Sequence, residues 1–199
     1  MKLFYYIIII IFASPLHNNF LFAQNKKNLS IETLKIKKAF AELKKDSTYS
    51  KQILFIESFP QDWNTFLKVF HPENFGELYD SSYYYLNKLY ELASVNSDKV
   101  GELLIKLAKD AEWDADAPGY LQSILADYAA KNTKKFVSLL SHEKNNNIHH
   151  IIVFLADVEN HNYYENYQLI IDNLIKLNEL KLAKKFEKAR ENRINQIDH

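Results

Sequence analysis

The stretch ELYDSSYYYLNKLYELA, residues 77–93, carries the clearest helical pattern in the chain. Its apolar and small side chains recur every three or four residues, which is the spacing of one face of an α-helix. The residues on this face are Leu78, Ser82, Tyr85, Leu86, Leu89, Leu92 and Ala93. Tyr83, Tyr84 and Tyr90 fall partly outside it. The segment therefore predicts an amphipathic helix over residues 77–93.

Capping residues predict the starts of further helices. Ser30 can cap a helix over residues 31–45, because its hydroxyl can accept a hydrogen bond from one of the first free backbone amides. Asp62 can cap a short helix in the same way, and Ser97 or Asp98 can cap another. Similar apolar spacing continues to the last predicted helix, which carries Leu182, Ala183, Phe186 and Ala189.

The composition favours helices throughout. The 199 residues are 47% hydrophobic and include only three glycines and four prolines, fewer turn residues than strands and tight hairpins need. The apolar run 148–155 also suits a buried strand, but no partner strand is predicted, so a buried helix is preferred. We therefore predict an all-α single domain over residues 24–199, frayed after about residue 194. Its roughly nine short helices can form an irregular bundle or loosely solenoidal stacked helix pairs.

The N-terminus predicts export. Residues 1–23 contain Lys2, an apolar stretch and a small residue, Ala23, after which cleavage is expected. Polar residues interrupt the apolar run before it reaches the roughly 20 residues that a membrane span needs, so no span is expected in the mature chain. The chain has no cysteine, which excludes disulfides and thiol nucleophiles. The expected location is the periplasm or the cell exterior.

Charge argues for a protein partner and against nucleic acid. The net charge is zero, whereas nucleic-acid-binding domains are usually basic. The charges are unevenly spread, with thirteen acidic residues and five lysines between Glu57 and Asp127. A basic protein partner would complement this middle region.

No motif identifies an enzyme. No serine lies in a Gly-x-Ser-x-Gly turn, and the three isolated glycines cannot form a phosphate-binding or dinucleotide-binding loop. No catalytic residue and no cofactor are therefore assigned. Tyrosine clusters at 83–85 and at 163, 164 and 167 can line a sugar- or peptide-binding groove, although core packing and the covering of loops explain them more simply.

The segment EWDADAPGYLQ, residues 112–122, is the strongest candidate site. One interpretation is a helix junction, in which Asp114 or Asp116 caps a helix and Pro118 lies in its first turn. The other is a hard-cation site, although the calcium-loop pattern fails because it needs Gly and Glu where Ala115 and Leu121 stand. We favour the junction and assign no metal ligand. The candidate binding residues are Asp110, Glu112, Trp113, Asp114 and Asp116.

Two segments resemble parts of known exported proteins. FPQDWNTFLKVF (59–70) and EWDADAPGYLQ resemble segments of secreted, all-helical bacterial proteins of uncharacterised function, and the composition resembles exported proteins of Bacteroidetes. The resemblance implies an exported helical fold and transfers no active residues.

Three functions follow as hypotheses. The first is an exported helical protein-binding module, with a periplasmic immunity or inhibitor protein against a basic toxin as one case. The second is a metal-dependent enzyme or metal-stabilised domain using the acidic segment 110–116. The third is a structural component of an envelope assembly.

Overall fold

The computed structural model describes residues 29–72, 76–157 and 165–197. Within them the chain is all-α, as predicted, and forms a single domain. A short 3-10 helix, η2 (Tyr79–Ser81), precedes α4. The α-helices are α1 (Ile31–Lys45), α2 (Tyr49–Ser58), α3 (Trp63–Phe70), α4 (Ser82–Ala93), α5 (Ser97–Ala108), α6 (Ala117–Lys131), α7 (Thr133–Leu140), α8 (Asn145–Ala156), α9 (Glu165–Lys176) and α10 (Leu180–Ile197).

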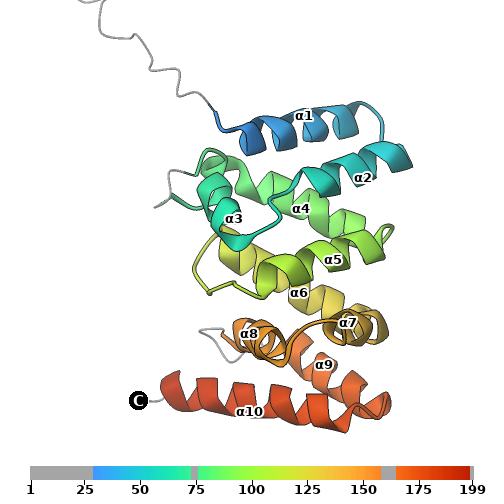
Figure 1. The fold of residues 1–199 in the computed structure, drawn as a ribbon, viewed down its shortest axis with the longest axis vertical. Coiled ribbons are helices and arrows are strands. Elements are labelled where there is room, and N and C mark those ends of the chain that lie inside the picture. The colour runs from blue at the N-terminus through green and yellow to red at the C-terminus, as the bar shows by residue number, and fades with distance from the viewer. Residues whose placement is uncertain (1–28, 73–75, 158–164, 198–199) are drawn as a thin grey trace, which may run out of the picture.

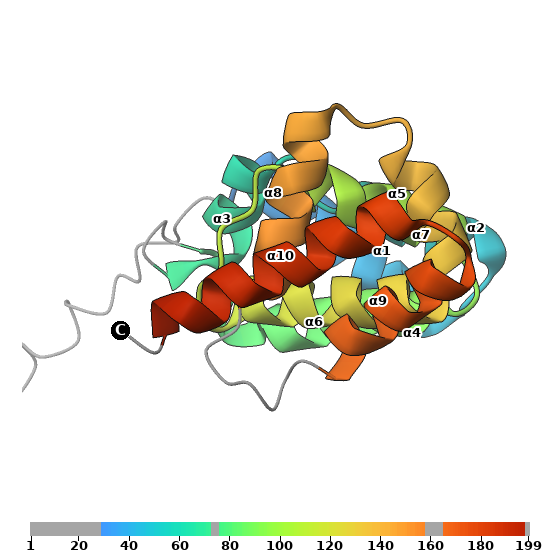
Figure 2. The ribbon, with the colours of Figure 1, turned by 90° about the horizontal axis from the view of Figure 1, so that it is seen from below.

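The helices are stacked in chain order along the longest axis of the molecule (Figure 1). Helices α1 and α2 lie at one end, and α10 lies at the other. Helices that lie next to each other in the stack pack together: α1 packs on α2, α4 on α5 and α6, α6 on α9, and α10 on both α8 and α9. The view along the stack shows α10 crossing over the end of the molecule (Figure 2). Of the two predicted arrangements, the structure therefore has stacked helix pairs.

Helix α1 begins where the sequence predicts, because Ser30 satisfies its first free amides. The Ser30 hydroxyl accepts a hydrogen bond from the Thr33 amide at 3.2 Å. The Ser30 amide and hydroxyl in turn donate to the Glu77 carboxylate, at 2.9 and 2.7 Å. The cap therefore also ties α1 to the segment that leads into α4.

Two other predicted starts differ in outcome. Asp62 caps α3 as predicted, accepting from the Thr65 amide at 2.9 Å. The prediction for α5 was wrong by one or two residues, because the cap position is Asn96 and its side chain caps no amide. Instead the Asn96 amide group donates to Gln52 of α2 at 2.6 Å. A tertiary contact has replaced the local cap.

The ambiguous apolar run 148–155 is helical. It forms most of α8, which begins at Asn145 and buries Ile151, Ile152, Phe154, Leu155 and Ala156. Helix α10 continues to Ile197, beyond residue 194, where we expected fraying.

The core near α3 is a cluster of aromatic rings. The Trp63 and Phe66 rings are stacked, with centroids 5.1 Å apart, and Trp63 also meets Phe154 of α8 edge-on at 6.1 Å. Phe70 lies between Phe59, Phe66 and Tyr85. These rings join α2, α3, α4 and α8 into one core.

Helices α5 and α6 approach each other closely at Gly101. A Cβ atom at this position would lie 2.1 Å from the Tyr128 hydroxyl and 2.9 Å from the Leu139 side chain. Tyr128 is fully buried, and its hydroxyl has no hydrogen-bond partner within the described part of the chain. A glycine is therefore needed here for space, since the backbone dihedral angles are those of an ordinary helix.

The turn between α9 and α10 fixes the direction of the last helix. Asn178 has a positive φ of 62°, which asparagine tolerates better than most residues. Its amide donates to the Ile175 carbonyl at 3.0 Å, and the Glu179 amide donates to the Leu174 carbonyl at 2.9 Å. This is the double hydrogen bond of a Schellman motif, which ends α9 and starts α10 within four residues.

No helix in the described part of the chain is long and apolar enough to cross a membrane. The predicted signal segment, residues 1–23, lies outside the described residues.

Candidate functional site

The acidic segment 110–116 connects α5 to α6, and two of its carboxylates bind groups within the chain. His71, at the end of α3, lies with its Nε2 atom 2.9 Å from Oδ2 of Asp114. Because an ionised carboxylate can only accept, this nitrogen carries the proton. The Tyr79 hydroxyl donates to Asp116 at 2.7 Å, and this bond raises the pKa of Tyr79. The segment is thereby fastened to both ends of the α3–α4 connection.

The capping role predicted for Asp114 or Asp116 is wrong. Asp116 occupies the cap position of α6, but its side chain accepts no amide of the helix. Its backbone has φ 61° and ψ −118°, a region that favours glycine, so the Asp116 conformation is strained. Asp114 accepts a hydrogen bond from the Ala115 amide, which precedes the helix. The Asp116 carboxylate, which would have capped the helix, accepts a hydrogen bond from Tyr79 instead.

The other predicted residues of the segment lie apart from these contacts. Trp113 is half-buried against the core, and Pro118 lies in the first turn of α6, as predicted. Asp110 and Glu112 line a shallow recess beside Asp62. Among the described residues no group of three or more histidine, cysteine or acidic side chains is arranged to hold a metal ion. The metal hypothesis thus gains no support from the geometry.

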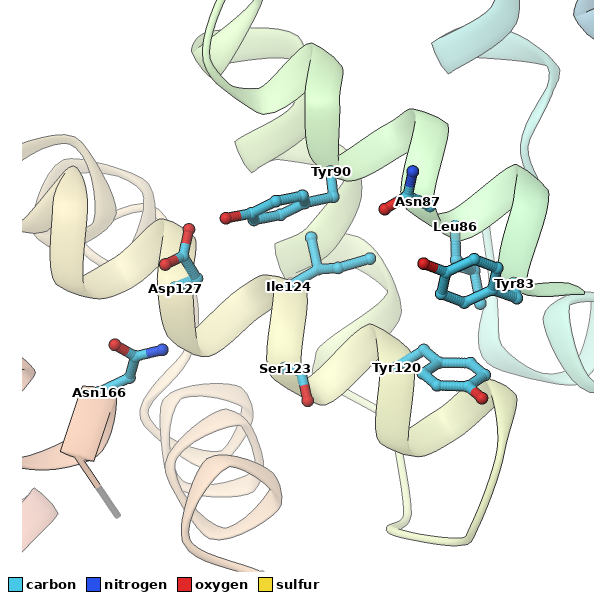
Figure 3. A pocket seen from close by; sticks show the side chains of 9 residues that line it. All are labelled: Tyr83, Leu86, Asn87, Tyr90, Tyr120, Ser123, Ile124, Asp127 and Asn166. Carbon is cyan, nitrogen blue, oxygen red and sulfur yellow. The ribbon is translucent and has the colours of Figure 1, made fainter. Parts of the chain in front are cut away.

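An apolar recess lies instead between α4 and α6, and we call it the tyrosine groove. Its volume is about 300 Å³ and its surface is mainly apolar. Figure 3 shows Tyr83 beside Tyr120 at one end, Tyr90 and Asp127 at the other, and Ile124 between them. The residues that line it are Tyr83, Leu86, Asn87, Tyr90, Tyr120, Ser123, Ile124, Asp127 and Asn166.

Helical spacing places these side chains in one groove. Tyr83 and Tyr90 are seven residues apart on α4, so they lie two turns apart on the same face. Tyr120, Ile124 and Asp127 follow the same spacing on α6, which packs directly against α4. Among the described residues, Asn166 of α9 is the one contribution from outside this pair. The described lining of the groove therefore lies on helices, mainly α4 and α6.

The tyrosine rings of the groove, and the Tyr84 ring beside it, are exposed yet contact neighbouring side chains. Tyr83, Tyr84, Tyr90 and Tyr120 are 55%, 64%, 39% and 41% exposed. The Tyr83 ring meets the rings of Tyr120 and Tyr84 edge-on, with centroids 5.8 and 6.0 Å apart. Edge-on packing of this kind is favourable for aromatic rings and limits their motion.

An ion pair closes one end of the groove. Lys131 lies 2.9 Å from the Asp127 carboxylate, and its ammonium group also donates to the Tyr90 hydroxyl at 3.3 Å. The hydrogen bond to Asp127, followed by that to Tyr90, raises the pKa of Lys131. Asp127 is the only carboxylate that lines the described groove, and it is already paired. The groove therefore offers aromatic rings, an apolar floor and neutral hydrogen-bonding groups. These features suit the binding of a ligand or a polypeptide segment.

Sequence reasoning found part of this groove. It marked the 83–85 cluster as a possible binding surface, but Tyr85 is buried and only Tyr83 lines the groove. It did not single out Tyr120, although this ring is exposed and lines the groove. In the second cluster Tyr167 is buried and donates to the Phe186 carbonyl at 2.7 Å, while residues 163 and 164 lie outside the described residues. The sequence feature that could have located the groove is the seven-residue spacing of Tyr83 and Tyr90, which both fall outside the apolar face of their helix.

Comparison of the chain with protein-family models, curated proteins and solved structures gives no match. The resemblance to secreted helical proteins is accordingly supported by its sequence segments alone.

Proposed function

We propose that this chain is an exported helical protein-binding module that holds a segment of its partner in the tyrosine groove. The observation that carries the proposal is the set of exposed tyrosines around an apolar floor on two packed helices. Tyrosine is enriched at protein interfaces because it offers a large, rigid surface with one polar tip. Binding hot spots of this kind are surrounded by contacts that contribute little binding energy themselves but exclude water.

The groove favours a polypeptide with an apolar anchor flanked by basic residues. A volume of about 300 Å³ accommodates one or two apolar side chains over Leu86 and Ile124. Asn87, Ser123 and Asn166 at its edges offer hydrogen bonds to a peptide backbone. The chain between Glu57 and Asp127 carries an excess of acidic residues, which favours a partner with positive charge. An immunity or inhibitor protein against a basic toxin fits this description.

The acidic segment is less suited to be the main binding surface. The Asp114 and Asp116 carboxylates already accept hydrogen bonds from His71 and Tyr79. Reversing their charges would break contacts that hold α6 in place, and a loss of binding would then have two explanations. The tyrosine rings can be truncated with less risk to the fold, since they are largely exposed.

We expect the double variant Tyr83→Ala/Tyr120→Ala to lose at least about tenfold in affinity for a partner captured from the native cells, because both aromatic contacts at one end of the groove are removed. Tagged full-length chain would be cross-linked in cells, purified, and its partner identified by mass spectrometry and then titrated. Tyr49→Ala is the matched control, because Tyr49 is 70% exposed on α2, away from the groove. A partner that binds all three proteins equally contradicts the groove proposal.

Export is the other part of the proposal, and it rests on the N-terminal pattern of residues 1–23. We expect the protein recovered from the periplasmic or extracellular fraction to begin at Gln24, as measured by intact mass. Recovery of the uncleaved chain in the cytoplasmic fraction would contradict it.

A further inference from the structure

A second cleft lies at the far end of the stack, between α8 and α10, and it is basic. Its volume is about 330 Å³, similar to that of the tyrosine groove. Helices α8 and α10 pack against each other at this end of the stack (Figure 1). The residues that line it are His149, Val153, Ala156, Asp157, Lys185, Lys188, Ala189, Asn192, Arg193 and Gln196.

The charge of the cleft is concentrated by helical spacing. Lys185, Lys188, Asn192 and Gln196 follow one another at three- and four-residue intervals, so they share one face of α10. The acidic residues of the same helix, Glu187 and Glu191, do not line the cleft. Neither Lys185 nor Lys188 has an ion-pair partner among the described residues.

An ion pair between Arg193 and Asp157 forms part of the wall. The Arg193 Nε atom lies 2.8 Å from Oδ1 of Asp157, and both atoms are inaccessible to solvent. Their alignment falls short of a hydrogen bond, so the attraction is mainly electrostatic. Because the contact uses Nε, the two terminal nitrogens of the guanidinium group remain able to donate to another anion. Asp157 thus positions the Arg193 side chain and leaves some of the guanidinium N–H donors available.

The balance of charge indicates what the cleft can bind. Among the described lining residues, three cations, Lys185, Lys188 and Arg193, face one carboxylate, Asp157, which leaves a formal charge of 3 − 1 = +2 when His149 is counted as neutral. A recess with this surplus attracts a doubly charged anion, and its concave shape suits a discrete group better than a flat charged surface. Ammonium and guanidinium groups together bind phosphate well.

We propose that the α8–α10 cleft binds a phosphate-type dianion carried by a small molecule, with Lys185, Lys188 and Arg193 as its ligands. The Asn192 and Gln196 amides, on the same face of α10, supply neutral donors. Val153 and Ala189 form an apolar wall beside the charged groups and can contact the organic part of a phosphate ester. The site is independent of the tyrosine groove.

To test this, the full mature chain is titrated with inorganic phosphate at constant ionic strength. Binding is monitored through the amide chemical shifts in NMR spectra. We expect saturable shifts in α8 and α10, and at least about fivefold weaker binding by Lys185→Gln/Lys188→Gln. The control is Lys184→Gln, an exposed lysine of the same helix that does not line the cleft. It should bind phosphate as the unchanged chain does.

Two outcomes would overturn the proposal. One is the absence of saturable shifts in α8 and α10, or equal weakening by the cleft variant and the Lys184→Gln control. The other is that the chain does not bind inorganic phosphate but binds phosphatidylglycerol vesicles more tightly than phosphatidylcholine vesicles. That second result would assign the basic face to a membrane surface.

Discussion

Gly101→Ala is expected to destabilise the protein by about 2 kcal/mol, although alanine favours helices more than glycine does. The intrinsic gain of Gly→Ala within a helix is about 1 kcal/mol. Against it, the new Cβ would lie 2.1 Å from the Tyr128 hydroxyl, 2.5 Å from the end of its ring and 2.9 Å from Leu139. Forcing an atom into a packed core typically costs about 1–3 kcal/mol, and this overlap is severe, so the cost exceeds the gain. Denaturant unfolding followed by circular dichroism measures the change.

Two variants make this prediction specific. Gly119→Ala is the matched control, since its Cβ would approach nothing closer than the Asp114 carbonyl, at 3.3 Å, and we expect it to change stability by less than about 1 kcal/mol. The double variant Gly101→Ala/Tyr128→Phe should recover part of the loss, because only the hydroxyl is removed and the ring remains. A Gly101→Ala protein as stable as the unchanged chain would contradict the close packing of α5 on α6.

The stability of the protein is expected to fall by about 2 kcal/mol through Tyr128 alone as the pH rises from about 10 to 12. Burial, with the nearby charges of Asp98 and Glu102, raises the pKa of Tyr128 from 10.0 to about 12. Between these values the unfolded chain loses the tyrosine proton and the folded chain keeps it. Ionisation therefore favours the unfolded state, and the contribution present below pH 10 is lost as the pH passes 12.

Comparison with Tyr128→Phe isolates this contribution from those of other alkaline groups. The Tyr128 hydroxyl is buried without a partner, so its removal should leave the protein equally stable or up to about 1 kcal/mol more stable at pH 7. Urea unfolding at pH 7, 10 and 11.5 would show the difference between the two proteins widening with pH. A constant difference would mean that Tyr128 ionises as easily in the folded chain as in the unfolded one.

Helix starts were predictable wherever the cap is local. The Ser30 and Asp62 side chains bond to amides three residues later, and sequence alone contains both partners. The predictions were wrong at Asp116 and at the start of α5, because in each case a side chain bonds to a distant residue. Asp116 accepts from Tyr79, and Asn96 donates to Gln52. Such pairings depend on the stacking order of the helices, which hydrophobic spacing does not specify.

The tyrosine groove was only partly predictable for the same reason. The face of α4 that carries Tyr83 and Tyr90 can be read from spacing, but the exposure of Tyr120 depends on which helix packs beside α6. The basic cleft was even less predictable from the sequence, because it combines His149 and Asp157 with residues of a helix about 30 positions later. The spacing of the α10 lysines can be read from the sequence, but the cleft forms only where α8 packs against that helix.

The most direct test of the binding-module account is site-specific photo-cross-linking in the native cells. A photoreactive p-benzoylphenylalanine would replace Tyr120 in the groove or, as control, Tyr49 on α2. The account predicts one light-dependent adduct with a second polypeptide from position 120 and none from position 49, attached at an apolar residue flanked by lysine or arginine. No adduct from position 120, or the same adducts from both positions, would contradict it.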